Sequence, residues 1–143
     1  MSIWKSSSSE VGKPWGEEVR WAAPWGVQGK VLRLAEGQRT SLKYYKRKNE
    51  VLFCLEGKAI IFAPKEKEFG DERSPSGATF FLEPGQILLV EPENPYRIKA
   101  HTDCVLVEVT YGGGQLGSDS VMLEDDFGRV KELNKSISDI IKE

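Results

Sequence analysis

The sequence GQRTSLKYYKRKNEVLFCLEG, residues 37–57, contains two short strand-like segments separated by a charged turn. The first segment is Thr40–Tyr45 and the second is Glu50–Leu55. Successive side chains of a strand point to opposite faces, so Lys43 and Tyr45 are expected to share one face of the first strand. Glu50 begins the second strand, directly after the turn. The stretch therefore predicts two adjacent strands that bring polar groups together on one face.

Similar short segments continue on both sides of this stretch, separated by Gly, Pro or charged turns. The charged segment Pro64–Gly77 is expected to be an exposed loop or hairpin extension, and the apolar spacing in Val121–Lys142 favours a short amphipathic helix. About nine short strands without alternating long helices predict an all-β sandwich or small barrel with a C-terminal helix, and argue against a parallel α/β fold. The other expected strands are Glu18–Ala22, Lys30–Ala35, Lys58–Ala63, Thr79–Leu82, Gln86–Val90, Tyr96–Ala100 and Val105–Tyr111.

Composition argues against several classes of protein. The 143 residues, 39% hydrophobic and 29% charged, predict one globular domain at residues 13–143 after a flexible Ser-rich leader at residues 1–12. A formal net charge of -2 argues against nucleic-acid binding, and no apolar stretch approaches the roughly 20 residues of a membrane span. Cys54 and Cys104 are expected to be buried free thiols, which favours the cytoplasm. The single histidine, His101, excludes a His-cluster metal site.

The spacing of Gly37, Lys43, Tyr45, Glu50 and Gly57 resembles the first motif of the cupin superfamily. The segment from Gly85 to Arg97 resembles the second cupin motif, with Tyr96 at the position of the family's last histidine ligand. The resemblance implies a double-stranded β-helix, the cupin jelly-roll barrel, with an N-terminal arm.

Four further motifs narrow the resemblance to the C-terminal cupin domain of type II mannose-6-phosphate isomerases. They are KPWG at residues 13–16, GQRTSL at 37–42, PYR at 95–97 and LEDDFGR at 123–129. This resemblance implies a sugar or sugar phosphate as the small-molecule ligand, and a homodimer. The Trp-rich N-terminal arm is then expected to be an exchanged or interface element.

The family's metal-ligand positions are occupied here by Lys43, Tyr45, Glu50 and Tyr96. An ammonium group has no lone pair to donate, and a protonated phenol is a poor ligand for a divalent ion. The sequence therefore predicts a site without a metal or other cofactor. In the simplest arrangement Lys43 forms a salt bridge with Glu50, and the two phenols form hydrogen bonds around this pair.

Two interpretations of these four residues remain open. They could form a pocket that binds, isomerises or epimerises a sugar or sugar phosphate, with Glu50 as base, a tyrosine as acid and Lys43 stabilising an enolate. They could instead be a satisfied polar core in a non-catalytic, small-molecule-binding or structural cupin. Arg97 is a candidate ligand-binding residue, and Arg39 is a candidate for a phosphate-binding rim.

Overall fold

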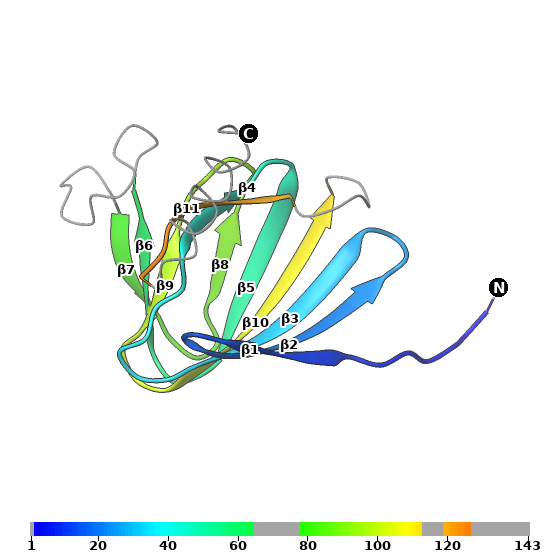
Figure 1. Ribbon diagram of the computed structural model, residues 1–143, viewed down its shortest axis with the longest axis horizontal. Helices are drawn as coiled ribbons and strands as arrows, with labels where there is room; N and C mark the ends of the chain where they lie inside the picture. Colours follow the sequence, from blue (N-terminus) through cyan, green and yellow to red (C-terminus); the bar gives the residue numbers. More distant parts are fainter. Residues whose placement is uncertain (1, 65–77, 113–118, 127–143) are drawn as a thin grey trace, which may run out of the picture.

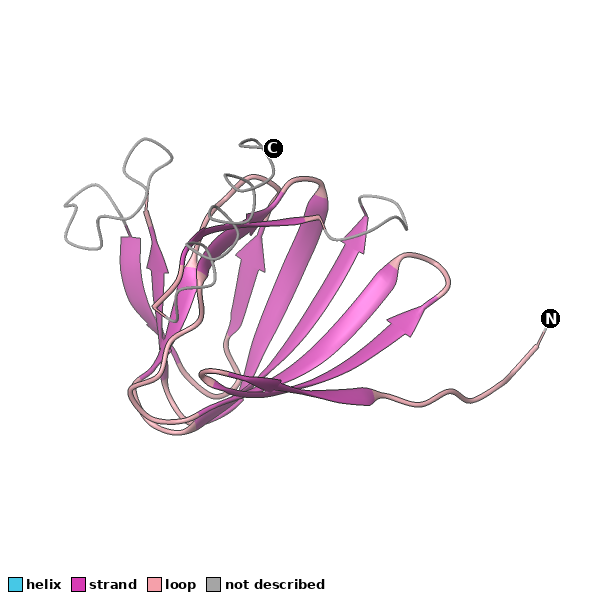
Figure 2. Cartoon of the chain, in the orientation of Figure 1, coloured by secondary structure: helices cyan, strands magenta, loops and turns pink. Residues whose placement is uncertain are grey.

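The computed structural model describes residues 2–64, 78–112 and 119–126, and within these residues every regular element is a β-strand (Figures 1 and 2). No helix there has the length and apolar character needed to cross a membrane. The strands are β1 (Ser9–Lys13), β2 (Gly16–Ala23), β3 (Val27–Leu34), β4 (Leu42–Tyr45), β5 (Lys48–Glu56), β6 (Ala59–Ala63), β7 (Ala78–Leu82), β8 (Ile87–Val90), β9 (Arg97–Ala100), β10 (Cys104–Gly112) and β11 (Ser120–Glu124).

Six strands form the larger sheet, in the order β1-β2-β3-β10-β5-β8. Every neighbouring pair in this sheet is antiparallel. The central pairs combine strands that lie far apart in the sequence, so the sheet depends on long-range contacts. In Figure 1 these strands lie side by side, with β5, β10 and β3 in the middle and β1 at one edge.

The opposing layer contains β7-β6-β9 and the pair β11-β4. The two groups are linked by isolated bridges, Arg39 with Lys99 and Lys43 with Tyr96. Backbone hydrogen bonds reinforce the second bridge, because the Lys43 amide donates to the Tyr96 carbonyl at 3.2 Å and the Tyr96 amide donates to the Lys43 carbonyl at 3.0 Å. The two layers form a jelly-roll barrel, as the sequence predicts.

An apolar core fills one end of the barrel. Its members come from both layers, and most are less than 5% exposed. They alternate with outward residues along their strands, as expected for a sheet that packs on one face against another. The cluster consists of Trp15, Leu32, Leu34, Leu52, Cys54, Ala59, Ile61, Leu82, Tyr96, Ile98, Ala100, Cys104 and Leu106.

Three local features differ from the sequence expectations. Strand β1 begins at Ser9, inside the segment expected to be a flexible leader, because it pairs with β2 over its whole length. Residues 120–124 form a strand instead of the start of a helix, because they pair with β4. Lys48 is the first residue of β5 and is buried, not part of an exposed turn. Residues 127–142 of the expected C-terminal helix, and residues 65–77 of the expected loop, lie outside the described residues.

Candidate functional site

The interior of the barrel changes from apolar to charged along the larger sheet. On β10, inward-facing Leu106 is followed two residues later by Glu108, and both are buried. The strand register places Glu108 opposite Lys30 of β3 and opposite Leu52 of β5. On β5, Glu50 and Lys48 lie two and four residues before Leu52, so they share its inward face. The alternation of these strands therefore brings charged groups together in one region of the barrel.

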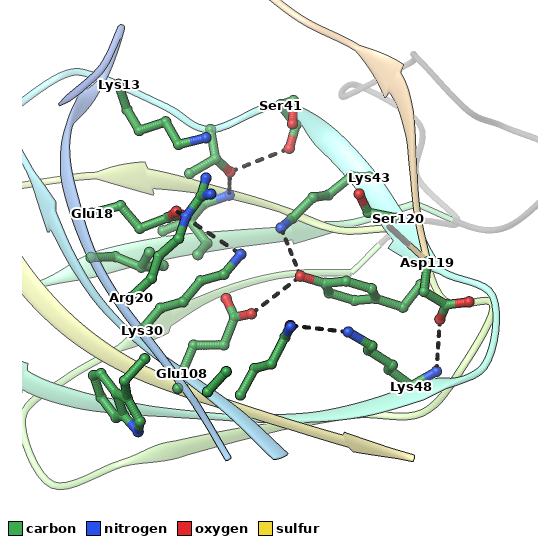
Figure 3. A pocket seen from close by; sticks show the side chains of 18 of the residues that line it. Lys13, Glu18, Arg20, Lys30, Ser41, Lys43, Lys48, Glu108, Asp119 and Ser120 are labelled. Carbon is green, nitrogen blue, oxygen red and sulfur yellow. Dashed lines mark hydrogen bonds and ion pairs between the residues drawn. The ribbon is translucent and has the colours of Figure 1, made fainter. Parts of the chain in front are cut away.

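A cavity of about 660 Å³ lies in this charged region (Figure 3). A volume of this size is ordinary for a small-molecule site. Five cationic and three acidic side chains line the cavity, together with hydroxyl and amide groups, so cations are in excess. The cations are Lys13, Arg20, Lys30, Lys43 and Lys48, and the acids are Glu18, Glu108 and Asp119.

One wall of the cavity carries a short hydrogen-bonded chain. The Lys43 ammonium donates to the Tyr45 hydroxyl at 3.4 Å, and that hydroxyl donates to Glu108 Oε1 at 3.4 Å. Burial disfavours the charge on Lys43, but the charge of Glu108, then Tyr45 and Glu50, holds the pKa of Lys43 above its ordinary value. Burial also raises the pKa of Tyr45. At neutral pH this wall therefore presents an ammonium, a protonated phenol and a carboxyl group.

Lys48 also lies near the ring of this tyrosine. Its side chain is almost fully buried, and its ammonium donates to the amide oxygen of Gln28 at 3.0 Å. The ammonium nitrogens of Lys43 and Lys48 lie 4.9 Å and 5.8 Å from the centre of the Tyr45 ring. Among the described residues, neither lysine forms an ion pair with a carboxylate. Two interior ammonium groups thus flank one phenol without a direct anionic partner.

Glu50 and Tyr96 form a separate buried pair. The Tyr96 hydroxyl donates to Glu50 Oε1 at 3.0 Å, and Glu50 Oε2 has no hydrogen-bond partner among the described residues. Burial and then the charge of Glu108 raise the pKa of Glu50 to about 8, and burial raises that of Tyr96. Tyr96 lines the cavity, whereas Glu50 is not one of its lining residues. The expected salt bridge between Lys43 and Glu50 is wrong, because each group contacts a phenol instead.

Asp119 joins the loop before β5 to the segment before β11. Its carboxylate accepts hydrogen bonds from the backbone amides of Arg47 at 2.7 Å and Lys48 at 2.9 Å. Burial opposes its charge, but these hydrogen bonds keep the pKa of Asp119 below its usual value. The contacts position Lys48 at the start of its strand.

A second group of charges lies on β2 and β3. Glu18 pairs with Arg20 and lies 3.7 Å from the Lys30 ammonium. Burial raises the pKa of Glu18, but the charge of Lys30 and the hydrogen bond from Arg20 outweigh it, so the net shift is downward. The pKa of Lys30 is lowered by burial and by repulsion from Lys43. An anion between Lys30 and Lys43 would relieve that repulsion.

Arg39 and Arg97 lie away from the cavity wall. Arg97 is 2% exposed and donates from Nε at 3.1 Å and from Nη2 at 3.0 Å to the Thr40 carbonyl. It also forms ion pairs with Asp126 at 3.4 Å and Glu124 at 3.7 Å. Arg39 forms an ion pair with the same Asp126. Both arginines therefore connect the end of β11 and the residues after it to the segment just before β4.

Of the residues predicted for the site, Lys43, Tyr45 and Tyr96 line the cavity, but seven of its eight charged residues were not predicted. Glu108 stands among valines in β10, and Lys30 and Glu18 lie on two paired strands. Side chains an even number of residues apart on a strand share a face. Glu108 lies two residues from the core residue Leu106, and Lys48 lies four residues from the core residue Leu52, so this spacing is the signal that could have found both. The signal is ambiguous because the outward residues of these strands are apolar too.

The residues at the family's ligand positions do not fit a divalent metal ion. The Lys43 ammonium is a donor without a lone pair, and the raised pKa values of Tyr45 and Tyr96 keep both phenols protonated. Residues 2–64, 78–112 and 119–126 contain no group of three or more His, Cys, Asp or Glu side chains arranged to hold a metal.

Comparison with known proteins gives a fold but no sequence family. No family model matches the chain, and no curated protein matches its sequence. Among solved structures, the capsular polysaccharide assembling protein CapF from Staphylococcus aureus aligns with a TM-score of 0.65 at 13% identity, over 85% of this chain and 34% of that chain. The oxalate decarboxylase formate complex from Lactobacillus farciminis aligns with a TM-score of 0.67 at 14% identity, over 95% of this chain and 43% of that one.

A DMSP lyase structure also aligns, with a TM-score of 0.56 at 20% identity, over 76% of this chain and 52% of that chain. The chain spans about a third of the length of CapF and about half of the DMSP lyase. At these identities the similarity concerns the fold alone. All three proteins have a cupin barrel, and the strand order, the two facing layers and the interior cavity described above show that this chain adopts the cupin jelly-roll fold.

Proposed function

We propose that the protein binds a small anionic ligand in the barrel cavity, with Lys43 and Lys48 as the principal contacts to the anion. The observation that carries the proposal is the pair of interior ammonium groups near the Tyr45 ring, neither of which forms an ion pair with a carboxylate in the part of the chain that the structure describes. Removing a charge from water costs several kcal/mol unless an opposite charge compensates it. Glu108 compensates the Lys43 charge without direct contact, and Lys48 forms no ion pair with a carboxylate of the described residues. A ligand anion would compensate Lys48 directly and add a direct contact to Lys43, and Lys30 adds a third positive charge nearby.

A sugar phosphate is the ligand class that we favour. The cavity wall combines cations with the hydroxyl and amide groups of Ser41, Tyr45, Tyr96, Ser120 and Gln28, which suit a ligand with several hydroxyl groups. The resemblance to type II mannose-6-phosphate isomerases points to the same class. Two structural neighbours are consistent with it, since one is named for polysaccharide assembly and another is a complex with the small anion formate.

The test is a calorimetric titration of the purified chain with hexose 6-phosphates and with the parent hexoses. We expect the phosphates to bind and the neutral sugars to bind at least tenfold more weakly. Lys48→Met should weaken phosphate binding by a similar factor, because it removes a buried ammonium. Lys46→Met is the matched control, because Lys46 is exposed two residues earlier and does not line the cavity.

Equal binding of hexoses and hexose phosphates would contradict the anionic part of the proposal. Unchanged phosphate affinity in Lys48→Met would contradict the role of the interior lysines. If no sugar phosphate binds, and both Lys43→Met and Lys48→Met lower the free energy of unfolding, the lysines belong to a structural polar core in a non-catalytic cupin.

Proton transfer to and from the bound sugar is a second candidate function. The Tyr45 to Glu108 hydrogen bond on the cavity wall favours it, because isomerisation of an aldose needs a base for a carbon-bound proton and an acid for the carbonyl oxygen. We assign the base to Glu108 and the acid to Tyr45, with Lys43 stabilising the developing enolate. Tyr96 also lines the cavity, and Glu50 accepts its hydrogen bond from behind the wall.

Deuterium exchange tests this second function without knowledge of the product. A hexose phosphate incubated with the protein in D₂O should incorporate deuterium next to the carbonyl carbon, as followed by NMR. Glu108→Gln should abolish the exchange and retain binding, whereas Glu56→Gln, at an exposed position of β5, should leave both unchanged. Binding without any exchange in the unaltered protein would limit the function to ligand binding.

A further inference from the structure

The outward face of the larger sheet is apolar where a solvent-facing sheet would be polar. On β5, β8 and β10 the outward positions hold Val, Phe, Leu, Ile and Tyr, apart from Asn49 near the start of β5, while Lys48, Glu50 and Glu108 are buried on the inward side. A sheet with aliphatic side chains on both faces is typical of one that is covered on both faces. We call the six most exposed of these side chains the outer face: Phe53, Leu55, Ile87, Leu89, Val109 and Tyr111.

The strand register makes this outer face continuous. Phe53 lies opposite Ile87 on one side and Val107 on the other, which gives one apolar row across three strands. Val51 lies opposite Leu89 and Val109, which gives a second row. Neither row contains a charged residue. Directly opposed side chains on one face of a sheet lie close together, so the two rows form one patch.

The exposure of these residues is high. Leu89 is 69% exposed, Ile87 55% and Leu55 51%, and Tyr111 and Phe53 follow with 48% and 37%. With typical side-chain areas, the six exposed parts sum to roughly 500 Å², at the upper end of what a monomeric protein leaves in water. Two such faces together reach roughly 1,000 Å², the area at which specific interfaces begin.

We propose that the outer face packs against the same face of a second copy of this chain, forming a two-fold symmetric dimer. A face without charge needs no oppositely charged partner, and a two-fold dimer requires a patch that complements itself. Two sheets pack face to face through aliphatic rows of this kind. The partly buried valines of the two rows add to the buried area.

This interface differs from the one expected at the Trp-rich N-terminal arm. Trp4 already contacts Trp25 of its own chain, with ring centres 6.2 Å apart in an edge-to-face arrangement. The larger apolar area lies on β5, β8 and β10, whereas Trp25 lies in the turn between β2 and β3. The outer face therefore predicts which substitutions separate the subunits.

The test is sedimentation velocity on the full chain at micromolar concentrations. We expect the mass of two chains for the unaltered protein. Leu89→Glu should weaken the dimer at least tenfold, and Tyr111→Glu, on a different strand of the outer face, should do the same. Circular dichroism checks the fold of each variant, and two positions on different strands keep the test valid if one variant fails to fold. Trp25→Glu is the matched control, since Trp25 is exposed and apolar but outside the face.

The proposal requires that Trp25→Glu remain dimeric. A monomeric unaltered chain at micromolar concentrations would overturn it, and would mean that another segment or partner covers the face. Dimers that survive both outer-face substitutions but dissociate with Trp25→Glu would move the interface to the arm and also overturn it. Sugar-phosphate binding is a separate measurement, so its result does not affect this one.

Discussion

The charged form of the Glu50 carboxyl group is poorly stabilised in the folded protein. One of its oxygens accepts from Tyr96 and the other has no partner within the described part of the chain. Burial, together with the nearby Glu108, raises its pKa from 4.5 to about 8. The folded protein therefore binds a proton at Glu50 more tightly than the unfolded chain does. This contribution to stability is fully present below pH 4.5 and is lost as the pH rises through about 8.

We therefore expect the free energy of unfolding to fall between about pH 5 and pH 8, by up to a few kcal/mol. Glu50→Gln should reduce this fall, because the amide stays neutral and its oxygen still accepts from Tyr96. Urea unfolding at several pH values measures the effect, with Glu56→Gln as an exposed control. Equal pH slopes in the unaltered protein and Glu50→Gln would show that Glu50 is not the responsible group.

At the scale of single residues, sequence spacing predicts which side chains share a face but not which charges they meet. Lys43 and Tyr45 are two residues apart and both line the cavity. Their contact with Glu108 depends on how β4 and β10 are placed across the barrel, and no local pattern contains that information. The salt bridge expected between Lys43 and Glu50 fails for the same reason, since proximity in the motif is not proximity of charged atoms.

Between elements, Arg97 joins three segments at the beginning of β9. Its guanidinium contacts the Thr40 carbonyl, which lies before β4. It also contacts the carboxylates of Glu124, at the end of β11, and Asp126, just after β11. Replacing the buried Arg97 leaves the Thr40 carbonyl without its two hydrogen bonds, and removes a cation from the partly exposed carboxylates of Glu124 and Asp126. Alternating polar residues in a short strand give no sign of this, so the sequence assigns Arg97 to a ligand.

We expect Arg97→Met to lower the free energy of unfolding by about 2 kcal/mol, because the buried Thr40 carbonyl loses its donors. Arg33→Met, which removes an exposed pair with Glu17, should cost at most about 1 kcal/mol. Denaturant unfolding of both variants gives the comparison. If Arg97→Met were as stable as Arg33→Met but bound sugar phosphates poorly, Arg97 would be a ligand contact after all.

The turn between β5 and β6 depends on Gly57. Its φ is 77°, and a Cβ there would lie 2.0 Å from the Asp103 carbonyl oxygen, a backbone atom. Gly26 has the same φ of 77°, but nothing lies within 4 Å of the corresponding position. The two glycines thus share the conformational requirement and differ only in the space around them.

Gly26→Ala should therefore cost about 1 kcal/mol, the strain of a positive φ, as measured by thermal or urea unfolding. Gly57→Ala should cost several times more or prevent folding, because backbone must move to admit the methyl group. Similar losses for the two variants would mean that the turn at Gly57 relaxes easily.

In the whole molecule, the apolar and charged ends of the barrel should differ in local stability. Leu52, Leu106 and Ile61 are fully buried at the apolar end, while the opposite end encloses the cavity. Local opening depends on the apolar area that must be exposed, so opening is easier around the cavity.

Hydrogen exchange should show this difference as slower amide exchange at Leu52–Leu55 than at Lys48–Glu50 of the same strand, by roughly tenfold. Addition of a bound sugar phosphate should slow exchange mainly at the charged end. Uniform protection along β5, before and after ligand addition, would contradict the division of the barrel into two ends.

Most of the fold was predictable from the sequence, because short apolar segments between Gly and Pro turns predict strands that pack against the core. Strand β1 was not, since Ser9–Lys13 is polar and is held as an edge strand by backbone pairing. Ser120–Glu124 was not either, since its apolar spacing also suits a helix and only its pairing with β4 selects the strand. Both cases depend on contacts distant in the sequence.

The contact between Trp4 and Trp25 has a spectroscopic consequence. Two indole rings at 6.2 Å with an angle of 63° between their planes have coupled electronic transitions, which should split into a pair of circular dichroism bands of opposite sign. That couplet would vanish in Trp4→Phe without any change in the barrel. The chain thus carries its own optical reporter of whether the N-terminal arm stays against the β2–β3 turn in solution.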